Sequence, residues 1–81
     1  MNTREIIRDF ITTEMLHQPL ETPLRDDAPL VESGIIDSMG VMTLLSFLEN
    51  TFSIQVSGED LMPENFSSIE TIATLVERYI R

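Results

Sequence analysis

The chain has 81 residues, no cysteine and a formal net charge of −9, and these values limit its size and its chemistry. A chain of this length forms one small domain, so we expect a single domain over residues 1–81. The lack of cysteine excludes disulfides and thiolate metal sites and is typical of a reducing compartment, so we expect a cytoplasmic protein without a metal. We expect no membrane insertion, because no segment is long and apolar enough, and no nucleic-acid partner, because an acidic surface repels one.

Residues 2 to about 16 have the periodicity of an amphipathic helix, and Asn2 with Glu5 fits a capping box at its start. Its apolar side consists of Ile6, Ile7, Phe10, Ile11 and Met15. Residues 17–37 contain three prolines, two adjacent acids and Gly34, which favours a long loop. The loop also has apolar residues, so we expect it to pack down as it crosses the bundle. These residues are Leu20, Leu24, Leu30, Val31, Ile35 and Ile36.

A second helix is predicted over residues 38–52, with Asp37 at the N-cap, where its carboxylate accepts from free backbone N–H groups and favours the helix dipole. At about 100° per residue, one stripe of this helix is apolar, and we assign it to the core. The stripe consists of Val41, Leu44, Leu45, Leu48 and Phe52. Met39, Met42 and Phe47 lie outside it.

Two further helices are predicted towards the C-terminus. Ser57 and Asp60 form a capping box and Pro63 stops the segment, which predicts a helix of one or two turns. A last helix begins at a second capping box, Ser67 with Glu70, and runs to the C-terminus. Its apolar positions are Ile69, Ile72, Ala73, Val76, Tyr79 and Ile80. The sequence therefore predicts an all-α fold, a small four-helix bundle of three longer helices and one short helix, with a long crossover loop between the first two.

Ser38 stands directly in front of the apolar stripe, and three roles fit its position. A nucleophile would need a general base, yet the only histidine, His17, is on a proline-rich segment and no G-x-S-x-G elbow is present, so we do not expect an enzyme. In a structural role, Asp37 caps the helix and Ser38 occupies its first turn. The third role is covalent attachment, because the free N–H groups and the dipole at a helix N-terminus favour the negative charge of a phosphodiester.

The order of these features resembles the acyl and peptidyl carrier protein family, whose attachment motif is Asp-Ser and an apolar residue at the start of the second helix. Asp37, Ser38 and Met39 stand in that place. The resemblance implies that Ser38, with Asp37 as part of the motif, carries 4′-phosphopantetheine that a phosphopantetheinyl transferase takes from coenzyme A. The terminal thiol of the arm would hold an acyl or aminoacyl group as a thioester. The implied protein is a monomeric carrier and not an enzyme.

The chain also departs from the fatty-acid carriers, in which glycine lies three residues before the serine and the second helix has many acids. Here Gly34 lies four residues before Ser38, Glu49 is the only acid after it in the helix, and Gly40 and Thr43 stand where carboxylates are expected. The segment looks more like the stand-alone carriers that adenylating enzymes load, such as the D-alanyl carrier protein. The implied partners are the transferase, an acyl- or aminoacyl-activating (adenylating) ligase and downstream acyl-transfer enzymes.

Met39, Met42 and Phe47 suggest an exposed partner-docking surface near the arm, since flexible methionine side chains adapt to several partners. The alternative is that these three side chains pack under the crossover loop. Glu49 is placed with the docking residues as an acid that steers the encounter. The residues also allow a second class of protein, which is a non-covalent acidic helical interaction module with no prosthetic group.

Overall fold

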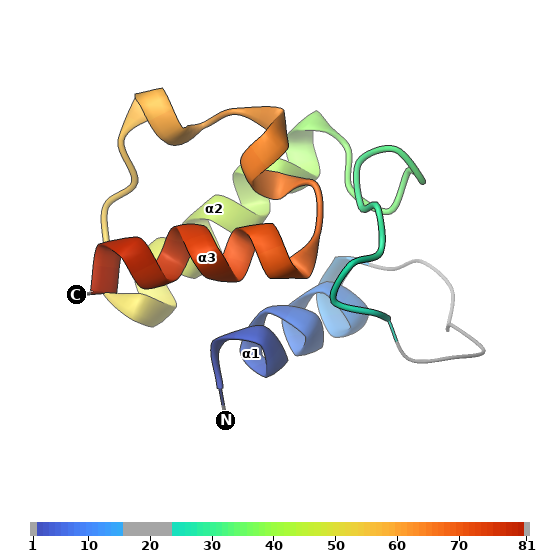
Figure 1. Cartoon of the computed structure of the whole chain (residues 1–81), viewed down its shortest axis with the longest axis horizontal. Helices are drawn as coiled ribbons and strands as arrows, with labels where there is room; N and C mark the ends of the chain where they lie inside the picture. Colours follow the sequence, from blue (N-terminus) through green and yellow to red (C-terminus); the bar gives the residue numbers. More distant parts are fainter. Residues whose placement is uncertain (1, 16–23, 81) are drawn as a thin grey trace.

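The computed structural model describes residues 2–15 and 24–80, and all regular secondary structure in these residues is helical (Figure 1). The elements are α1 Thr3–Phe10, a π-helix Ile11–Met15, α2 Ser38–Phe52, the 3-10 helices η2 Gly58–Asp60 and η3 Pro63–Phe66, and α3 Ile69–Ile80. α3 packs against both α1 and α2. The predicted all-α fold with three longer helices is confirmed. None of the helices in the described part combines the length and apolar character that a bilayer crossing requires.

The first helix begins as predicted, because the side chain of Asn2 accepts a hydrogen bond from the Glu5 backbone N–H at 2.9 Å. α1 passes directly into the π-helix, which ends at Met15. The helical run therefore covers the predicted segment up to Met15, the end of the first described range. Ile7 and Ile11 are fully buried, and they hold this run against the rest of the bundle. Leu16 and Leu20, which the prediction also covered, lie outside the described residues.

The crossover segment packs onto the bundle as predicted over its described part, residues 24–37. Its buried side chains are Leu24, Leu30 and Ile36. The backbone N–H of Leu30 donates to the Ser67 carbonyl at 2.8 Å, which ties the segment to the start of α3. Val31 is an exception, since it stays partly exposed to solvent.

Asp26 makes a second connection between the crossover segment and the helices. Its carboxylate forms ion pairs with Arg8 and, at 3.9 Å, with Arg4, both on α1. Its backbone carbonyl accepts from the Glu70 N–H of α3 at 2.9 Å. Because the same residue contacts α1 and α3, the segment that leads to α2 has a fixed course over the bundle.

The predicted short helix forms as η2, but Pro63 does not stop it and a second short helix follows. η2 ends at Asp60, and Pro63 is the first residue of a second 3-10 helix. Proline suits a first helical position because its missing N–H would have no intrahelical partner there. The Ser57 side chain accepts from the Glu59 N–H at 3.3 Å, so the cap that we expected with Asp60 is made one residue earlier.

The predicted start of the last helix is shifted by one residue. Ser68 caps α3 reciprocally with Thr71: the Thr71 N–H donates to Ser68 Oγ at 3.2 Å, and the Ser68 N–H donates to Thr71 Oγ1 at 3.1 Å. Ser67, which we expected to cap with Glu70, instead donates its hydroxyl to the Glu64 carbonyl at 3.0 Å. Either of two adjacent serines can cap a helix, so the sequence pattern did not distinguish them.

The core stripe of α2 is confirmed at its centre, and at its ends it packs against the core with partial exposure. Leu44, Leu45 and Leu48 are buried, whereas Val41 and Phe52 are only half-buried. In α3 the predicted positions Ile69, Ile72, Ala73 and Val76 are buried together with Leu75. Near the end of that helix Tyr79 is half-buried and Ile80 is exposed.

Candidate functional site

Ser38 is the first residue of α2, and its side chain is exposed. Asp37 has the extended backbone of an N-cap, and its Oδ1 accepts from the Gly40 N–H at 2.7 Å. The Asp37 carbonyl also accepts from the Val41 N–H at 2.9 Å. The N-cap prediction for Asp37 is therefore confirmed, and these two bonds fix the backbone on either side of the serine.

The turn before Asp37 depends on Gly34, whose φ of 82° lies in the left-handed region that favours glycine. Its N–H donates to the Val31 carbonyl at 3.1 Å, and the Ile36 N–H donates to the Leu30 carbonyl at 3.1 Å. Because Leu30 and Ile36 are both buried, the turn holds the chain on the bundle and delivers Asp37 to the start of α2.

Gly40 has a packing role that the sequence analysis missed. A Cβ atom at this position would lie 2.9 Å from Cγ2 of Ile36, 3.0 Å from Cε of Met15 and 3.3 Å from Oδ1 of Asp37. Contacts this short would displace the neighbours, and one of these is the capping carboxylate. Glycine therefore lets the π-helix end and the crossover segment approach the first turn of α2. A glycine two residues after Ser38 is the sequence signal that could have indicated this.

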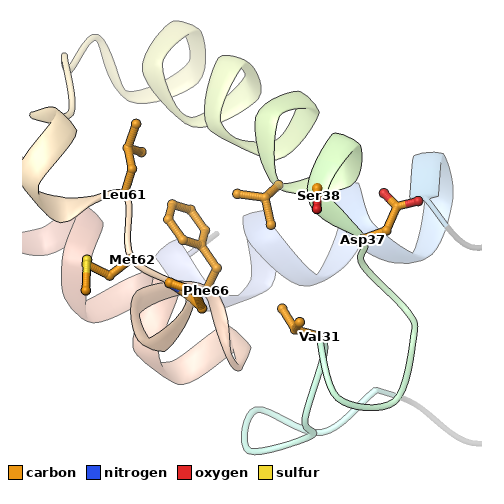
Figure 2. Close-up of a pocket in the computed structure, with 8 residues that line it drawn as sticks. Val31, Asp37, Ser38, Leu61, Met62 and Phe66 are labelled. Atoms are coloured by element: carbon orange, nitrogen blue, oxygen red, sulfur yellow. The ribbon is translucent and has the colours of Figure 1, made fainter.

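An open groove of about 240 Å³ lies beside Ser38 (Figure 2). Besides Asp37 and Ser38, it is lined by Val31, Val41, Leu61, Met62, Pro63 and Phe66. Figure 2 shows Leu61 and Met62 across the groove from Asp37 and Ser38. The sequence analysis did not predict this groove, and it explains why Val41 is only half-buried: the side chain lines the groove.

The four residues predicted for partner docking divide into two groups. Met39 is 80% exposed and Met42 is 57% exposed, so both side chains are accessible beside the serine. Phe47 is half-buried, with its ring stacked on Phe10 of α1 at a centroid distance of 3.9 Å. The prediction that Phe47 is exposed is therefore wrong, and the aromatic ring that covers it in the described part of the chain is Phe10 of α1.

Glu49 also differs from the prediction, because its side chain has an internal partner. Its Oε2 accepts a hydrogen bond from the Val56 N–H at 2.9 Å, and the side chain is half-buried. The carboxylate thus stabilises the chain reversal after α2, where Ser53 has a left-handed backbone with φ of 56°. The hydrogen bond leaves the negative charge of Glu49 in place, so its role in steering a partner stays a prediction.

The described arginines all form ion pairs with acids of this chain. Arg4 and Arg8 pair with Asp26, and the other pairs are Arg25 with Asp27 and Arg78 with Asp60. Exposed acids near Ser38, such as Asp37, therefore leave a negative field that favours a basic partner. No group of three or more His, Cys, Asp or Glu residues with metal-site geometry occurs within residues 2–15 and 24–80.

The capping bond of Asp37 leads to a test of the local structure. Asp37→Ala is expected to lower the free energy of unfolding by about 1 kcal/mol, because the Gly40 N–H loses its acceptor. Asp37→Asn keeps an acceptor and is expected to stay closer to the wild type. Chemical denaturation followed by circular dichroism measures both variants. Equal losses for the two would show that the carboxylate charge, and not the hydrogen bond, stabilises the start of α2.

The residues at the start of α2 fit a phosphodiester on Ser38. The hydroxyl is exposed on the first turn of a 15-residue helix, where backbone N–H groups and the helix dipole favour negative charge. The apolar groove beside it offers room for an attached chain.

Comparisons with known proteins agree with this site. The family described as "Phosphopantetheine attachment site" matches residues 7–77, which is most of the chain. The chain is also 29% identical over 55 residues to a probable acyl carrier protein, PigG, from a Serratia species, and the match covers 68% of this chain and 63% of that relative. The chain belongs to the family of phosphopantetheine attachment domains, the non-catalytic carriers to which 4′-phosphopantetheine is attached.

Proposed function

We propose that Ser38 is the attachment residue and that the protein presents an acyl or aminoacyl thioester to partner enzymes. The observation that carries the proposal is the exposed Ser38 hydroxyl in the first turn of α2, directly after a backbone that the Asp37 cap holds in place. The apolar groove beside it and the Asp-Ser-Met sequence support the same assignment. The arm would supply the thiol on which the thioester forms.

Attachment would join the Ser38 oxygen to the phosphorus next to the pantetheine part of coenzyme A. The bond to the other phosphate breaks, 3′,5′-ADP leaves, and the hydroxyl proton passes to a base of the transferase. The contribution of this chain is placement and charge stabilisation. The Gly40 N–H donates to the Asp37 carboxylate. The remaining N–H groups of the first turn are free to stabilise the anionic diester.

We also propose that an adenylating ligase loads the arm. Support comes from α2, whose only acid, Glu49, is engaged with the Val56 N–H, while Met39 and Met42 are exposed. This surface differs from the acid-rich second helix of the fatty-acid carriers and agrees with the resemblance to carriers loaded by adenylating enzymes. The name of the Serratia relative indicates an acyl cargo for that protein, and an aminoacyl cargo is the second class to test.

Intact mass spectrometry tests the attachment residue. After incubation with coenzyme A and a broad-specificity phosphopantetheinyl transferase, the wild-type mass is expected to rise by one phosphopantetheinyl group. Ser38→Ala is expected to keep its original mass. Ser46→Ala is the matched control, because Ser46 is an exposed serine of the same helix and its loss should leave modification unchanged.

Two results would contradict the proposal. A mass gain in Ser38→Ala would move the attachment to another residue. A wild-type mass that never changes with several such transferases would favour the non-covalent interaction module. The first result leaves the carrier function intact, whereas the second removes it.

A further inference from the structure

The wall of the groove opposite Ser38 has little regular structure of its own. It consists of Leu61 and Met62, which connect η2 to η3, and of Pro63 and Phe66 in η3, so only short 3-10 helices flank it. Leu61 is 37% exposed and Met62 is 49% exposed, which means that burial alone does not hold these two side chains in place. Phe66 is buried and anchors the far end. The near end therefore needs another attachment to the bundle.

Asp60, the residue directly before Leu61, provides that attachment. Its Oδ2 accepts a hydrogen bond from the Tyr79 hydroxyl of α3, and its Oδ1 lies 4.0 Å from Nη2 of Arg78. Its backbone carbonyl accepts from Nδ2 of Asn65 at 2.7 Å. One residue thus connects the last turn of α3, the start of the wall and η3.

The Tyr79 hydroxyl bonds on both of its sides. Besides donating to Asp60, it accepts from the Ser57 N–H at 3.0 Å. These two bonds bracket η2 and fix it to α3, a 12-residue helix whose inner face is buried. The sequence analysis counted Tyr79 among the apolar positions of the last helix, and the structure leaves it half-buried with its hydroxyl bonded to Ser57 and Asp60.

We propose that Tyr79 is a positioning residue that acts through Asp60 to hold the wall formed by Leu61 and Met62. It thereby sets how well a phosphopantetheinyl transferase, which has to reach Ser38 in the lining of this groove, engages the protein. The part that concerns partners rests on the proposed function. The part that concerns the wall does not, because it depends only on the contacts of Tyr79 and Asp60. The two parts are tested separately.

Hydrogen exchange on the unmodified protein tests the wall. Tyr79→Phe removes the hydroxyl and keeps the ring, and it is expected to speed amide exchange in residues 57–65 by about threefold or more while the first turn of α2 is unchanged. Thr74→Val is the matched control, since it removes another α3 hydroxyl, one that donates to the Glu70 carbonyl at 3.0 Å. Its effect on residues 57–65 should be absent. Equal exchange in Tyr79→Phe and the wild type, or a uniform increase over the whole chain, would overturn the positioning role.

Ultraviolet titration gives a second readout, because Tyr79 is the only tyrosine and the chain has no tryptophan. The hydrogen bond to Asp60 raises the pKa of Tyr79, and the Ser57 N–H and the charge of Arg78 oppose this shift. The pKa of Tyr79, followed by the absorbance of the tyrosinate, is therefore expected above the ordinary value of about 10 in the wild type. In Asp60→Ala the pKa should lie closer to that ordinary value. Because the folded-state pKa is raised, the contact stabilises the fold at neutral pH and is lost as the pH rises through that pKa. An equal pKa in both proteins would show that Tyr79 is not hydrogen-bonded to Asp60 in solution.

Steady-state kinetics with the transferase tests the effect on partners. Tyr79→Phe and Asp60→Ala are expected to raise the KM for the protein substrate about threefold or more with kcat within about twofold, as a loss of uniform binding does. Asp60→Asn keeps an oxygen acceptor for Tyr79 and should rescue most of the effect. Unchanged KM values together with faster wall exchange would overturn the partner half of the proposal. If the wild type is never modified, that half fails with the proposed function, while exchange and titration still decide the role of Tyr79.

Discussion

Replacing Leu44 by alanine is expected to lower the free energy of unfolding by about 2 to 5 kcal/mol. Leu44 is fully buried in the middle of α2, within the core that α1 and α3 also form. Truncation removes its contacts and leaves a cavity that rigid neighbours fill only in part. A domain of this size has a total stability of about 4 to 12 kcal/mol, so the loss is a large fraction. Thermal denaturation should show a midpoint about 10 °C lower or more.

Two variants of the same helix serve as controls for Leu44→Ala. Met42→Ala changes a side chain that is 57% exposed, and Ser38→Ala changes an exposed residue of the first turn. Both are expected to stay within about 0.5 to 1 kcal/mol of the wild type. Denaturation midpoints that coincide for Leu44→Ala and Met42→Ala would mean that the inner face of α2 has been misassigned.

The features that the sequence predicted correctly depend on neighbours within about one helical turn. Asn2 and Asp37 each cap a helix by accepting from a backbone N–H three residues later, so residue type and spacing suffice to identify them. Leu44 and Leu48 lie on one side of α2 by the helical repeat alone. The exposed position of Ser38 in the first turn of α2 follows from the same local pattern, whereas its role as attachment residue stays a prediction.

Two features that were predicted wrongly, the surroundings of Phe47 and of Glu49, depend on contacts beyond one helical turn. Phe47 looks exposed on a helical wheel, but it stacks on Phe10 of another helix. Glu49 has the appearance of a solvent-facing acid, yet the reversal at Ser53 brings the Val56 N–H to it. Neither contact leaves a pattern in the residues around it.

The groove beside Ser38 also arises from contacts between separate segments, so the sequence pattern could not predict it. Its walls come from the crossover segment, from α2 and from the two 3-10 helices, and these meet only in the folded chain. Val31 and Val41 fit the pattern of ordinary core residues, and Pro63 fits that of a helix stop. The Tyr79 contact with Asp60 is a further case, because the helical repeat shows only that Tyr79 is an apolar position of the last helix and does not reveal the partner of its hydroxyl.

Met39→Ala is expected to lower kcat/KM for loading of the pantetheinylated protein by the proposed adenylating ligase about five- to tenfold, the range typical of an apolar interface anchor. Met39 follows Ser38 directly and is 80% exposed, so a partner that reaches the arm meets this side chain. Helicity should not change, because the side chain has little burial to lose. The measurement is the initial loading rate, corrected by control reactions that lack the ligase, and circular dichroism checks the fold.

Salt separates apolar contact from charge in the same experiment. Exposed acids such as Glu32 and Asp37 should steer the encounter, so added salt is expected to lower the association rate moderately and to leave the effect of Met39→Ala in place. Ile80→Ala is the matched control: Ile80 is also apolar and 51% exposed, but it lies at the C-terminal end of α3, away from the start of α2 (Figure 1). Its rate should equal that of the wild type. If high salt abolishes loading and Met39→Ala has no effect at any salt concentration, recognition is electrostatic and the apolar docking surface on α2 is refuted.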